Sequence, residues 1–292
     1  MYTVSLIAAP KLANLQTGLL NELARRWQGG TARWLNPGIA AEFDIPAMPG
    51  DLDQVWGDLQ TIGLDLVIQP RSGRRKKILL ADMDSTMIEQ ECIDELADMA
   101  GVGARVAEIT SRAMNGELNF HEALVERVGL LAGLRETVIG EVLKTRITLA
   151  PGGRELVATM RANGAYTALV SGGFTAFTRE VAQWLGFDEH RANTLLAEDG
   201  VLTGHVALPV LGREAKTEAL EEITAARGLA FGDVLAVGDG ANDLGMLQRA
   251  GAGVALHAKP AVAAQAGVRI NHGDLTALLY LQGYSAADFV TG

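Results

Sequence analysis

Two carboxylates separated by a single residue follow an apolar run in the first third of the chain. Asp82 and Asp84 come directly after residues 78–81, in the string Asp82-Met83-Asp84-Ser85-Thr86. Burying a charge is costly unless the charge is paired or bound to a metal, so this pair indicates a bound cation. The structural alternative is an Asx-type turn, in which the carboxylates accept backbone N–H groups.

Three further motifs combine glycine with hydroxyl, amine or carboxylate groups. Ser171-Gly172-Gly173 precedes a predicted helix, where free N–H groups and the positive end of the helix dipole attract an anion. Lys216 lies in the first turn of another predicted helix, where a cation opposes the dipole and indicates an anionic partner. The string Gly238-Asp239-Gly240-Ala241-Asn242-Asp243 is again acidic and rich in glycine. Each motif alone is compatible with an ordinary turn.

A parallel sheet would bring these motifs together. Apolar runs that end in a turn and are followed by helical patterns predict strands at 78–81, 166–170, 234–237, 253–256 and 268–270. Such strands indicate a sheet buried on both faces, with ligands bound beyond the carboxyl ends of the strands. Carboxylates for a divalent cation, donors for phosphate oxygens and one lysine at that edge are what phosphoryl transfer requires.

The four motifs resemble those of the haloacid dehalogenase (HAD) superfamily of phosphotransferases, and within it the phosphoserine phosphatases, over residues 76–284. That superfamily has an Asp-x-Asp pair, a Ser or Thr, a Lys and a terminal acidic motif. These match, in order, Asp82 with Asp84, Ser171, Lys216, and Asp239 with Asp243. The resemblance implies an α/β fold with a Rossmann-like parallel sheet core (the HAD fold) and a helical cap inserted after the first motif.

The resemblance also implies catalytic roles. Asp82 would attack phosphorus and form an aspartyl-phosphate, and Asp84 would protonate the leaving oxygen and then activate water. Mg²⁺ would be held by Asp82, the backbone carbonyl of Asp84 and Asp239. Asp243 would orient Lys216 or metal-bound waters from outside the ligand set.

Substrate recognition is implied in the same way. Lys216, Ser171 and the Gly172 N–H would bind the phosphoryl oxygens, with Asn242 as a further donor. In the cap, Glu91 would meet a substrate ammonium and Arg127 a substrate carboxylate. Phe120 and Met114 match apolar positions that shield the site. Without the resemblance, Glu91 and Arg127 would be interpreted as solvated surface residues.

The order of elements divides the chain into three parts. Residues 1–72 predict the order β-α-β-β-α-β of a ferredoxin-like, ACT-like α+β module, with helices over 11–28 and 51–62. Residues 73–88 and 148–292 are expected to form the phosphatase core, which includes a β-hairpin over 195–206, and residues 89–147 the helical cap. An edge-to-edge homodimer through the first module is a further expectation.

Composition excludes several classes of protein. The 292 residues carry a formal charge of -10, which disfavours a nucleic-acid partner, and the basic string 74–77 is expected to be a solvated linker. No apolar segment is long enough to span a membrane. The single cysteine, Cys92, excludes an intrachain disulfide and fits a reducing cytoplasm.

The function implied by the resemblance is Mg-dependent hydrolysis of O-phospho-L-serine to L-serine and phosphate, the last step of L-serine biosynthesis. One alternative is a related phosphatase or phosphotransferase acting on phosphohomoserine, phosphothreonine or another small phosphomonoester. A second alternative, from a different class, is a non-catalytic amino-acid sensor.

Overall fold

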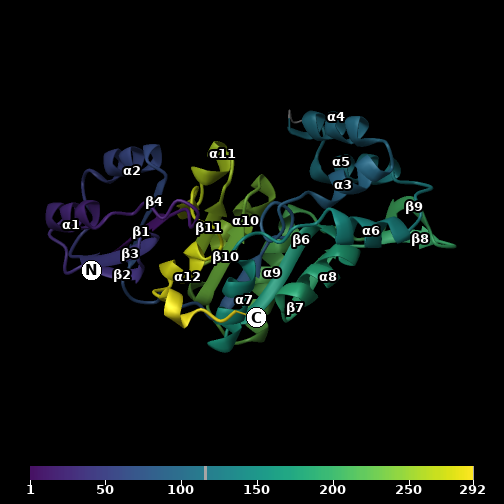
Figure 1. Cartoon of the computed structure of the whole chain (residues 1–292). Helices are drawn as coiled ribbons and strands as arrows, with labels where there is room; N and C mark the ends of the chain where they lie inside the picture. Colours follow the sequence, from purple (N-terminus) through teal and green to yellow (C-terminus); the bar gives the residue numbers. More distant parts are fainter. Residues whose placement is uncertain (115–116, 292) are drawn as a thin grey trace.

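The computed structural model describes residues 1–114 and 117–291, with the side chain of Met114 left out (Figure 1). The first part of the chain folds into a four-stranded antiparallel sheet in the order β2-β3-β1-β4. This is the predicted ferredoxin-like arrangement. Its elements are β1 (Tyr2–Ala8), α1 (Thr17–Arg26), β2 (Arg33–Asn36), β3 (Ala40–Ile45), α2 (Leu52–Thr61) and β4 (Leu64–Pro70).

The first helix of this part differs from its predicted bounds, whereas the second agrees with them. The predicted helix start at Lys11 is wrong, because the chain turns first: Ala13 has a left-handed backbone with φ of 45° and exposes Leu12, and α1 starts at Thr17. Asp51 precedes α2 but gives it no side-chain cap. Its carboxylate instead accepts hydrogen bonds from Arg26 Nε and Trp27 Nε1 of α1.

The helices of the first sheet cover one of its faces with a separate small core. Alternate residues of the central strands, such as Val4 and Leu6, face that core, as the twofold period of a strand requires. Trp27 is buried there, and Trp34 and Trp56 pack against it.

The second sheet consists of six parallel strands in the order β12-β11-β10-β5-β6-β7. Alternate strand residues face opposite layers: Leu79 packs with α7 and α8, whereas Leu80 packs with α9 and α10. The sheet is therefore buried on both faces, as its apolar strands predict. The strands are β5 (Ile78–Ala81), β6 (Tyr166–Phe174), β7 (Glu189–Asn193), β10 (Val234–Gly238), β11 (Ala252–Leu256) and β12 (Val268–Ile270). The helices are α7 (Gly153–Ala162), α8 (Thr175–Leu185), α9 (Arg213–Ala226), α10 (Leu244–Arg249), α11 (Pro260–Ala263) and α12 (Ala277–Leu281).

Strand β7 was not predicted, because its sequence is polar. It pairs with β6 alone among the described strands, so one side of it faces away from the sheet. Glu189 and Arg191 form an ion pair, and Arg191 also pairs with Glu222 of α9. Charged side chains are typical of edge strands, since they discourage further strand pairing.

Helices α3 to α6, which follow β5, form the predicted helical segment and lie over one end of the six-stranded sheet (Figure 1). Helix α5 begins with a capping box between Asn119 and Glu122. The predicted hairpin forms from β8 and β9, and Val201 of β9 bridges to Arg135 between α5 and α6. The elements are α3 (Cys92–Met99), α4 (Gly103–Met114), α5 (Phe120–Gly129), α6 (Thr137–Thr145), β8 (Leu195–Glu198) and β9 (Val201–Val206).

Buried polar contacts join the two sheets. The Asp65 carboxylate on β4 is fully buried and accepts hydrogen bonds from the backbone N–H groups of residues 271, 272 and 273, which follow β12. Arg74 was expected to be solvated, but its side chain is only 11% exposed and pairs with Glu42 of β3. It also donates to the carbonyl oxygen of Leu281. Arg74 is therefore a junction residue rather than part of an open linker.

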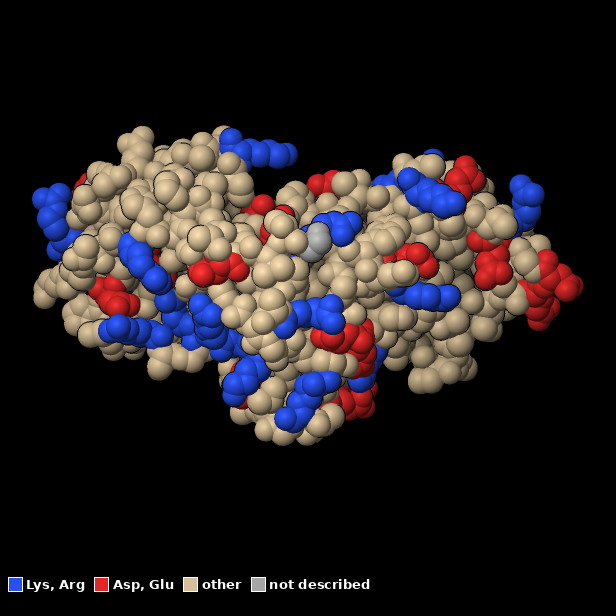
Figure 2. All heavy atoms as spheres, turned by 60° about the horizontal axis from the view of Figure 1, so that its bottom comes forward, with Lys and Arg blue, Asp and Glu red and all other residues tan. Residues whose placement is uncertain are grey.

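The surface shows charges of both signs. On the face in Figure 2, basic and acidic side chains both occur across the width of the molecule. Within the described residues, no helix is long and apolar enough to cross a membrane.

Candidate active site

The carboxyl end of β5 places Asp82 at the centre of a charged cluster. Asp82 is 5% exposed, and its Oδ1 accepts hydrogen bonds from the Met83 N–H (2.8 Å) and from Lys216 Nζ (2.7 Å). Its own N–H donates to the carbonyl oxygen of Val237 on β10. Burial, reinforced by repulsion from Asp243, outweighs Lys216 and holds the pKa of Asp82 well above its usual range.

Lys216 of α9 bridges two motifs. It is 1% exposed, and its Nζ lies 2.7 Å from Asp82 and 2.6 Å from Asp243. Burial acts to lower the pKa of Lys216, but attraction to the two carboxylates is stronger and raises it. Asp243 also accepts a hydrogen bond from the Gly240 N–H at 2.9 Å, so Lys216 and its partner are both fixed.

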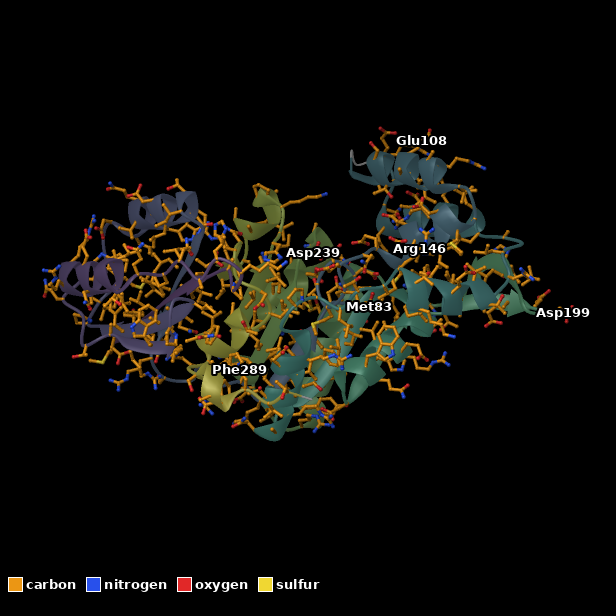
Figure 3. The ribbon with its side chains drawn as sticks, viewed as in Figure 1. Met83, Glu108, Arg146, Asp199, Asp239 and Phe289 are labelled. Atoms are coloured by element: carbon orange, nitrogen blue, oxygen red, sulfur yellow. The ribbon has the colours of Figure 1, made fainter. Side chains whose placement is uncertain are left out.

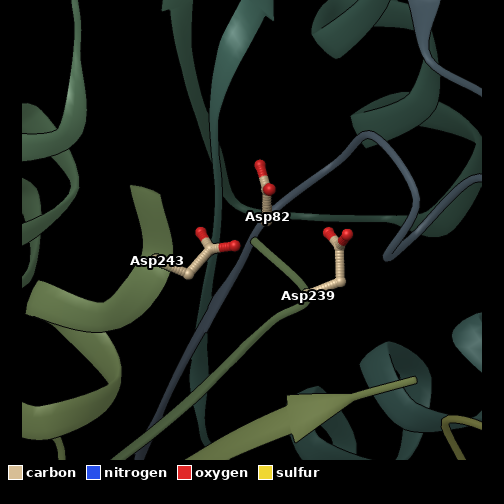
Figure 4. A group of neighbouring side chains, drawn as sticks. All are labelled: Asp82, Asp239 and Asp243. Carbon is tan, nitrogen blue, oxygen red and sulfur yellow. The ribbon is translucent and has the colours of Figure 1, made fainter. Parts of the chain in front are cut away.

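Three carboxylates converge at this edge of the sheet. Oxygens of Asp82, Asp239 and Asp243 lie within 4.8 Å of one another (Figure 4). Asp239 accepts a hydrogen bond from Thr86 Oγ1 at 3.1 Å, and burial followed by repulsion from Asp243 raises its pKa. One lysine does not neutralise three carboxylates, and carboxylate oxygens are the ligands that hard divalent cations prefer. The cluster therefore fits a hard divalent cation.

Asp84 is held apart from that cluster. Its Oδ1 accepts a hydrogen bond from the Cys92 N–H (2.9 Å) and its Oδ2 from Ser171 Oγ (3.1 Å). The Gly173 N–H in turn donates to Ser171 Oγ at 2.8 Å. A Cβ atom on Gly173 would lie 2.6 Å from Asp84 Oδ2, so any larger residue there would displace the Asp84 carboxylate.

These groups line one cavity of about 140 Å³ between the sheet edge and the helical segment. Figure 3 shows Met83 and Asp239 at the edge of the sheet below the helices. The residues singled out in the sequence that line the cavity are Asp82, Asp84, Glu91, Phe120, Arg127, Ser171, Gly172, Asp239 and Asn242. Gly173 and Gly240, from the two glycine-rich strings, also line it. Three lining residues were not singled out: Ile93, Leu124 and Phe174.

The helical segment supplies one anion and one cation to this cavity. Glu91 accepts a hydrogen bond from Ser85 Oγ at 2.7 Å, and burial followed by repulsion from Asp84 raises its pKa to about 7. Burial lowers the pKa of Arg127, although Asp94 opposes this effect. Arg127 is partly buried, whereas Glu91 lines the cavity but remains an exposed residue. Phe120 lines the cavity, whereas the Met114 side chain lies outside the described residues.

Two residues that support the site were not predicted from the sequence. Thr86, which orients Asp239, follows the Asp-x-Asp pair directly, and its place in that motif was the available signal. Asn193 of β7 hydrogen-bonds to the backbone of Gly172 and Leu211. It belongs to no motif, and only the fold brings it to the site.

The fold and this site define the class of protein. The family model for haloacid dehalogenase-like hydrolases matches residues 79–248. The chain belongs to this family.

Several curated relatives are named phosphoserine phosphatases. The protein of Archaeoglobus fulgidus is 44% identical over 227 residues, which are 76% of this chain and 66% of that protein. The protein of Albidiferax ferrireducens is 46% identical over 210 residues, which are 70% of this chain and 89% of that protein. The chain spans only 54% of a Streptomyces coelicolor relative that is 41% identical.

Solved structures share the fold. A HAD family hydrolase from Salmonella enterica serovar Typhi has a TM-score of 0.86 at 30% identity and covers 96% of this chain and 98% of its own. A substrate-bound phosphoserine phosphatase has a TM-score of 0.66 at 41% identity over 70% of this chain and 98% of its own. The match with the Salmonella hydrolase includes the N-terminal antiparallel sheet.

Proposed function

We propose that this hydrolase is a phosphoserine phosphatase, which cleaves O-phospho-L-serine to L-serine and phosphate through an aspartyl-phosphate. The observation that carries the proposal is the cavity that holds Glu91 and Arg127 opposite Asp82. An ammonium and a carboxylate on one small substrate complement that pair of side chains, while its phosphoryl group faces Asp82. The named phosphoserine phosphatases among the relatives support the same substrate.

Asp82 would act as the nucleophile. One carboxylate oxygen attacks phosphorus, the bond from phosphorus to the serine oxygen breaks, and the electron pair leaves on that oxygen. Lys216 lies 2.7 Å from Asp82 and would neutralise charge that develops on the phosphoryl oxygens. Ser171, Gly172 and Asn242 line the same cavity and would donate hydrogen bonds to those oxygens.

Asp84 would act as acid and then as base. In its protonated form it gives a proton to the departing serine oxygen, and the resulting carboxylate takes a proton from the water that attacks the aspartyl-phosphate. The water oxygen then forms the new bond to phosphorus, and Asp82 regains its carboxylate. The hydrogen bonds from Ser171 and the Cys92 N–H keep Asp84 fixed through both steps.

Mg²⁺ is the proposed cofactor. Asp82, Asp239 and the backbone carbonyl of Asp84 would hold it, and Asp243 would orient Lys216 beside it. The bound ion supplies positive charge that the single lysine lacks and stabilises negative charge on the phosphoryl group.

The setting of the enzyme is also proposed. We place the catalysis in the cytoplasm, where a single reduced Cys92 is expected. We further propose a division of the chain into an ACT-like module (residues 1–72), a core (73–88 and 148–292) and a cap (89–147). We also propose that the chain forms a homodimer through the ACT-like module. A light-scattering mass and a titration with L-serine test the dimer and the module.

The substrate is tested by steady-state kinetics on O-phosphoserine, phosphothreonine, phosphohomoserine and p-nitrophenyl phosphate. We expect the highest kcat/KM on O-phosphoserine. A higher value on another phosphomonoester would reject this substrate and favour the related phosphatase.

D82N separates an enzyme from an amino-acid sensor. We expect a loss of at least about 10³-fold in kcat with the fold retained, because the nucleophile is removed. The matched control is D199N in the β8–β9 turn, where Asp199 has a left-handed backbone that asparagine tolerates. An inactive wild type that still binds serine would support the sensor.

A further inference from the structure

The phosphate-binding motif interrupts the pairing of β6 with β7. The ladder runs in register up to Val170 with Arg191 and resumes at Phe174 with Asn193. Residues 171–173 therefore bulge out of the sheet opposite a single residue of β7. A bulge of this kind leaves backbone groups without their ladder partners, and those groups belong to the motif that faces the phosphate.

The Asn193 side chain replaces the missing partners. Its Nδ2 donates to the carbonyl oxygens of Gly172 (2.9 Å) and Leu211 (3.1 Å), and its Oδ1 accepts from the Leu211 N–H (2.7 Å). Asn193 is 2% exposed, so no water can take over these bonds. One amide thus fastens the bulge to the segment that leads into α9, which carries Lys216.

The bond to Gly172 has a consequence at the reacting groups. The carbonyl of Gly172 and the N–H of Gly173 belong to one planar peptide, so fixing one fixes the other. The Gly173 N–H donates to Ser171 Oγ, and Ser171 Oγ donates to Asp84 Oδ2. The series of hydrogen bonds therefore runs from the edge strand to the proposed general acid.

We propose that Asn193 is a positioning residue for phosphoryl transfer. Its amide sets the plane of the Gly172–Gly173 peptide and hence the direction of the Ser171 hydroxyl, and it keeps the bulge at a fixed distance from the start of α9. The inference rests on the proposed function of the same site.

The test is N193D. Aspartate has the size of asparagine and still accepts a hydrogen bond from the Leu211 N–H. It cannot donate hydrogen bonds to the carbonyl oxygens of Gly172 and Leu211, and its carboxylate oxygen would face both of them. We expect kcat to fall by roughly 10- to 100-fold, with KM changed much less, because the groups are displaced rather than removed. A loss should also appear on p-nitrophenyl phosphate, since it presents the same phosphoryl group.

A control variant and two measurements, vanadate binding and circular dichroism, distinguish a positioning role of Asn193 from a role in folding. T194V removes an exposed hydroxyl contact with Thr175 from the adjacent position and should keep wild-type kinetics. Vanadate mimics the five-coordinate phosphorus, and its affinity is measured by calorimetric titration with Mg²⁺ present. We expect its Kd for N193D to rise over that for the wild type by the same factor by which kcat/KM falls. Circular dichroism reports the folded fraction at the assay temperature, and N193S provides a second variant if N193D does not fold.

A kcat within twofold of wild type in folded N193D, or a loss that matches the unfolded fraction, would overturn the inference. If the wild type hydrolyses no phosphomonoester, the proposed function is wrong. Vanadate binding needs no turnover and still decides the role of Asn193: equal affinity of wild type and variant rejects it.

Discussion

At the scale of single residues, the site concentrates negative charge in a small volume. Asp82, Asp239 and Asp243 repel one another, and Lys216 compensates for only part of that charge. Burial raises the pKa values of Asp82 and Asp239, and repulsion from Asp243 raises both further. A bound cation removes it, so metal binding and stability should be linked.

Mg²⁺ should therefore stabilise the protein as well as activate it. We expect EDTA to abolish hydrolysis and Mg²⁺ to restore it, and Mg²⁺ at 100 times its Kd to add about 2.7 kcal/mol to the free energy of unfolding. D239N should lose most of this stabilisation in a thermal melt, whereas D199N should keep it. Activity that is insensitive to chelation would remove the metal from the mechanism.

Glu91 should give the enzyme a pH dependence that depends on the substrate. Its pKa of about 7 means that the carboxyl group of the free enzyme is increasingly protonated as the pH falls below 7, and the proton cancels its attraction for an ammonium. We expect kcat/KM on O-phosphoserine to fall on the acid side of about pH 7.

The control for this effect is glycerol 2-phosphate, which has no ammonium but ionises at its phosphate in a similar range of about pH 6. The pH profile of kcat/KM on glycerol 2-phosphate should lack the fall caused by protonation of Glu91. The E91Q variant should lack the same fall on O-phosphoserine. Identical profiles on both substrates in the wild type would assign the titration to another group.

At the scale of elements, we propose that helices α3 to α6 select the phosphomonoester. Arg127 on α5 and Glu91 before α3 reach the cavity from outside the sheet, whereas the groups proposed to bind phosphate come from its strand ends. On this proposal, separate elements supply recognition and chemistry.

R127A should for this reason reduce kcat/KM on O-phosphoserine by about 30- to 150-fold, which corresponds to the loss of a charged hydrogen bond worth about 2–3 kcal/mol. Activity on p-nitrophenyl phosphate should change little, because that substrate has no carboxylate. R112A is the matched control, since Arg112 pairs with Glu117 and Glu126 on the outside of the same helical segment. Equal losses on both substrates would show that Arg127 does not select the substrate.

At the scale of the whole molecule, the two sheets are joined by buried polar groups rather than by a free linker. Asp65 receives three backbone hydrogen bonds from the segment after β12, and Arg74 pairs with Glu42 near the start of the core. We infer that the N-terminal sheet and the core unfold as coupled units.

D65N tests this coupling. The asparagine N–H₂ group would face backbone donors that the carboxylate now accepts, so we expect a loss of about 3 kcal/mol in the free energy of unfolding. Tryptophan fluorescence during urea unfolding reports chiefly on the N-terminal sheet, which holds Trp27, Trp34 and Trp56. The control is D58N, because Asp58 is an exposed residue of α2. An unchanged free energy of unfolding in D65N would show that the contact does not couple the sheets.

Much of the fold could be predicted from the sequence because its signals are local. Apolar runs ending in acidic or glycine-rich turns predict β5, β6 and β10, and the Asp-x-Asp and Gly-Asp-Gly strings mark the edge where Asp82 and Asp239 meet. Strand β7 was missed, since its sequence carries charges that also suit a loop.

The sequence by itself indicated the class of chemistry, because carboxylates, a hydroxyl group and glycines follow strands with a clear apolar pattern, and Lys216 lies in the first turn of a helix. Only the tertiary structure decided which distant groups support them. Asn193 fills a bulge in its neighbouring strand, and Asp65 and Arg74 join the two sheets. Each of these side chains meets its partner across a large separation in the chain, and such contacts leave no periodic signal because they depend on strand order and register.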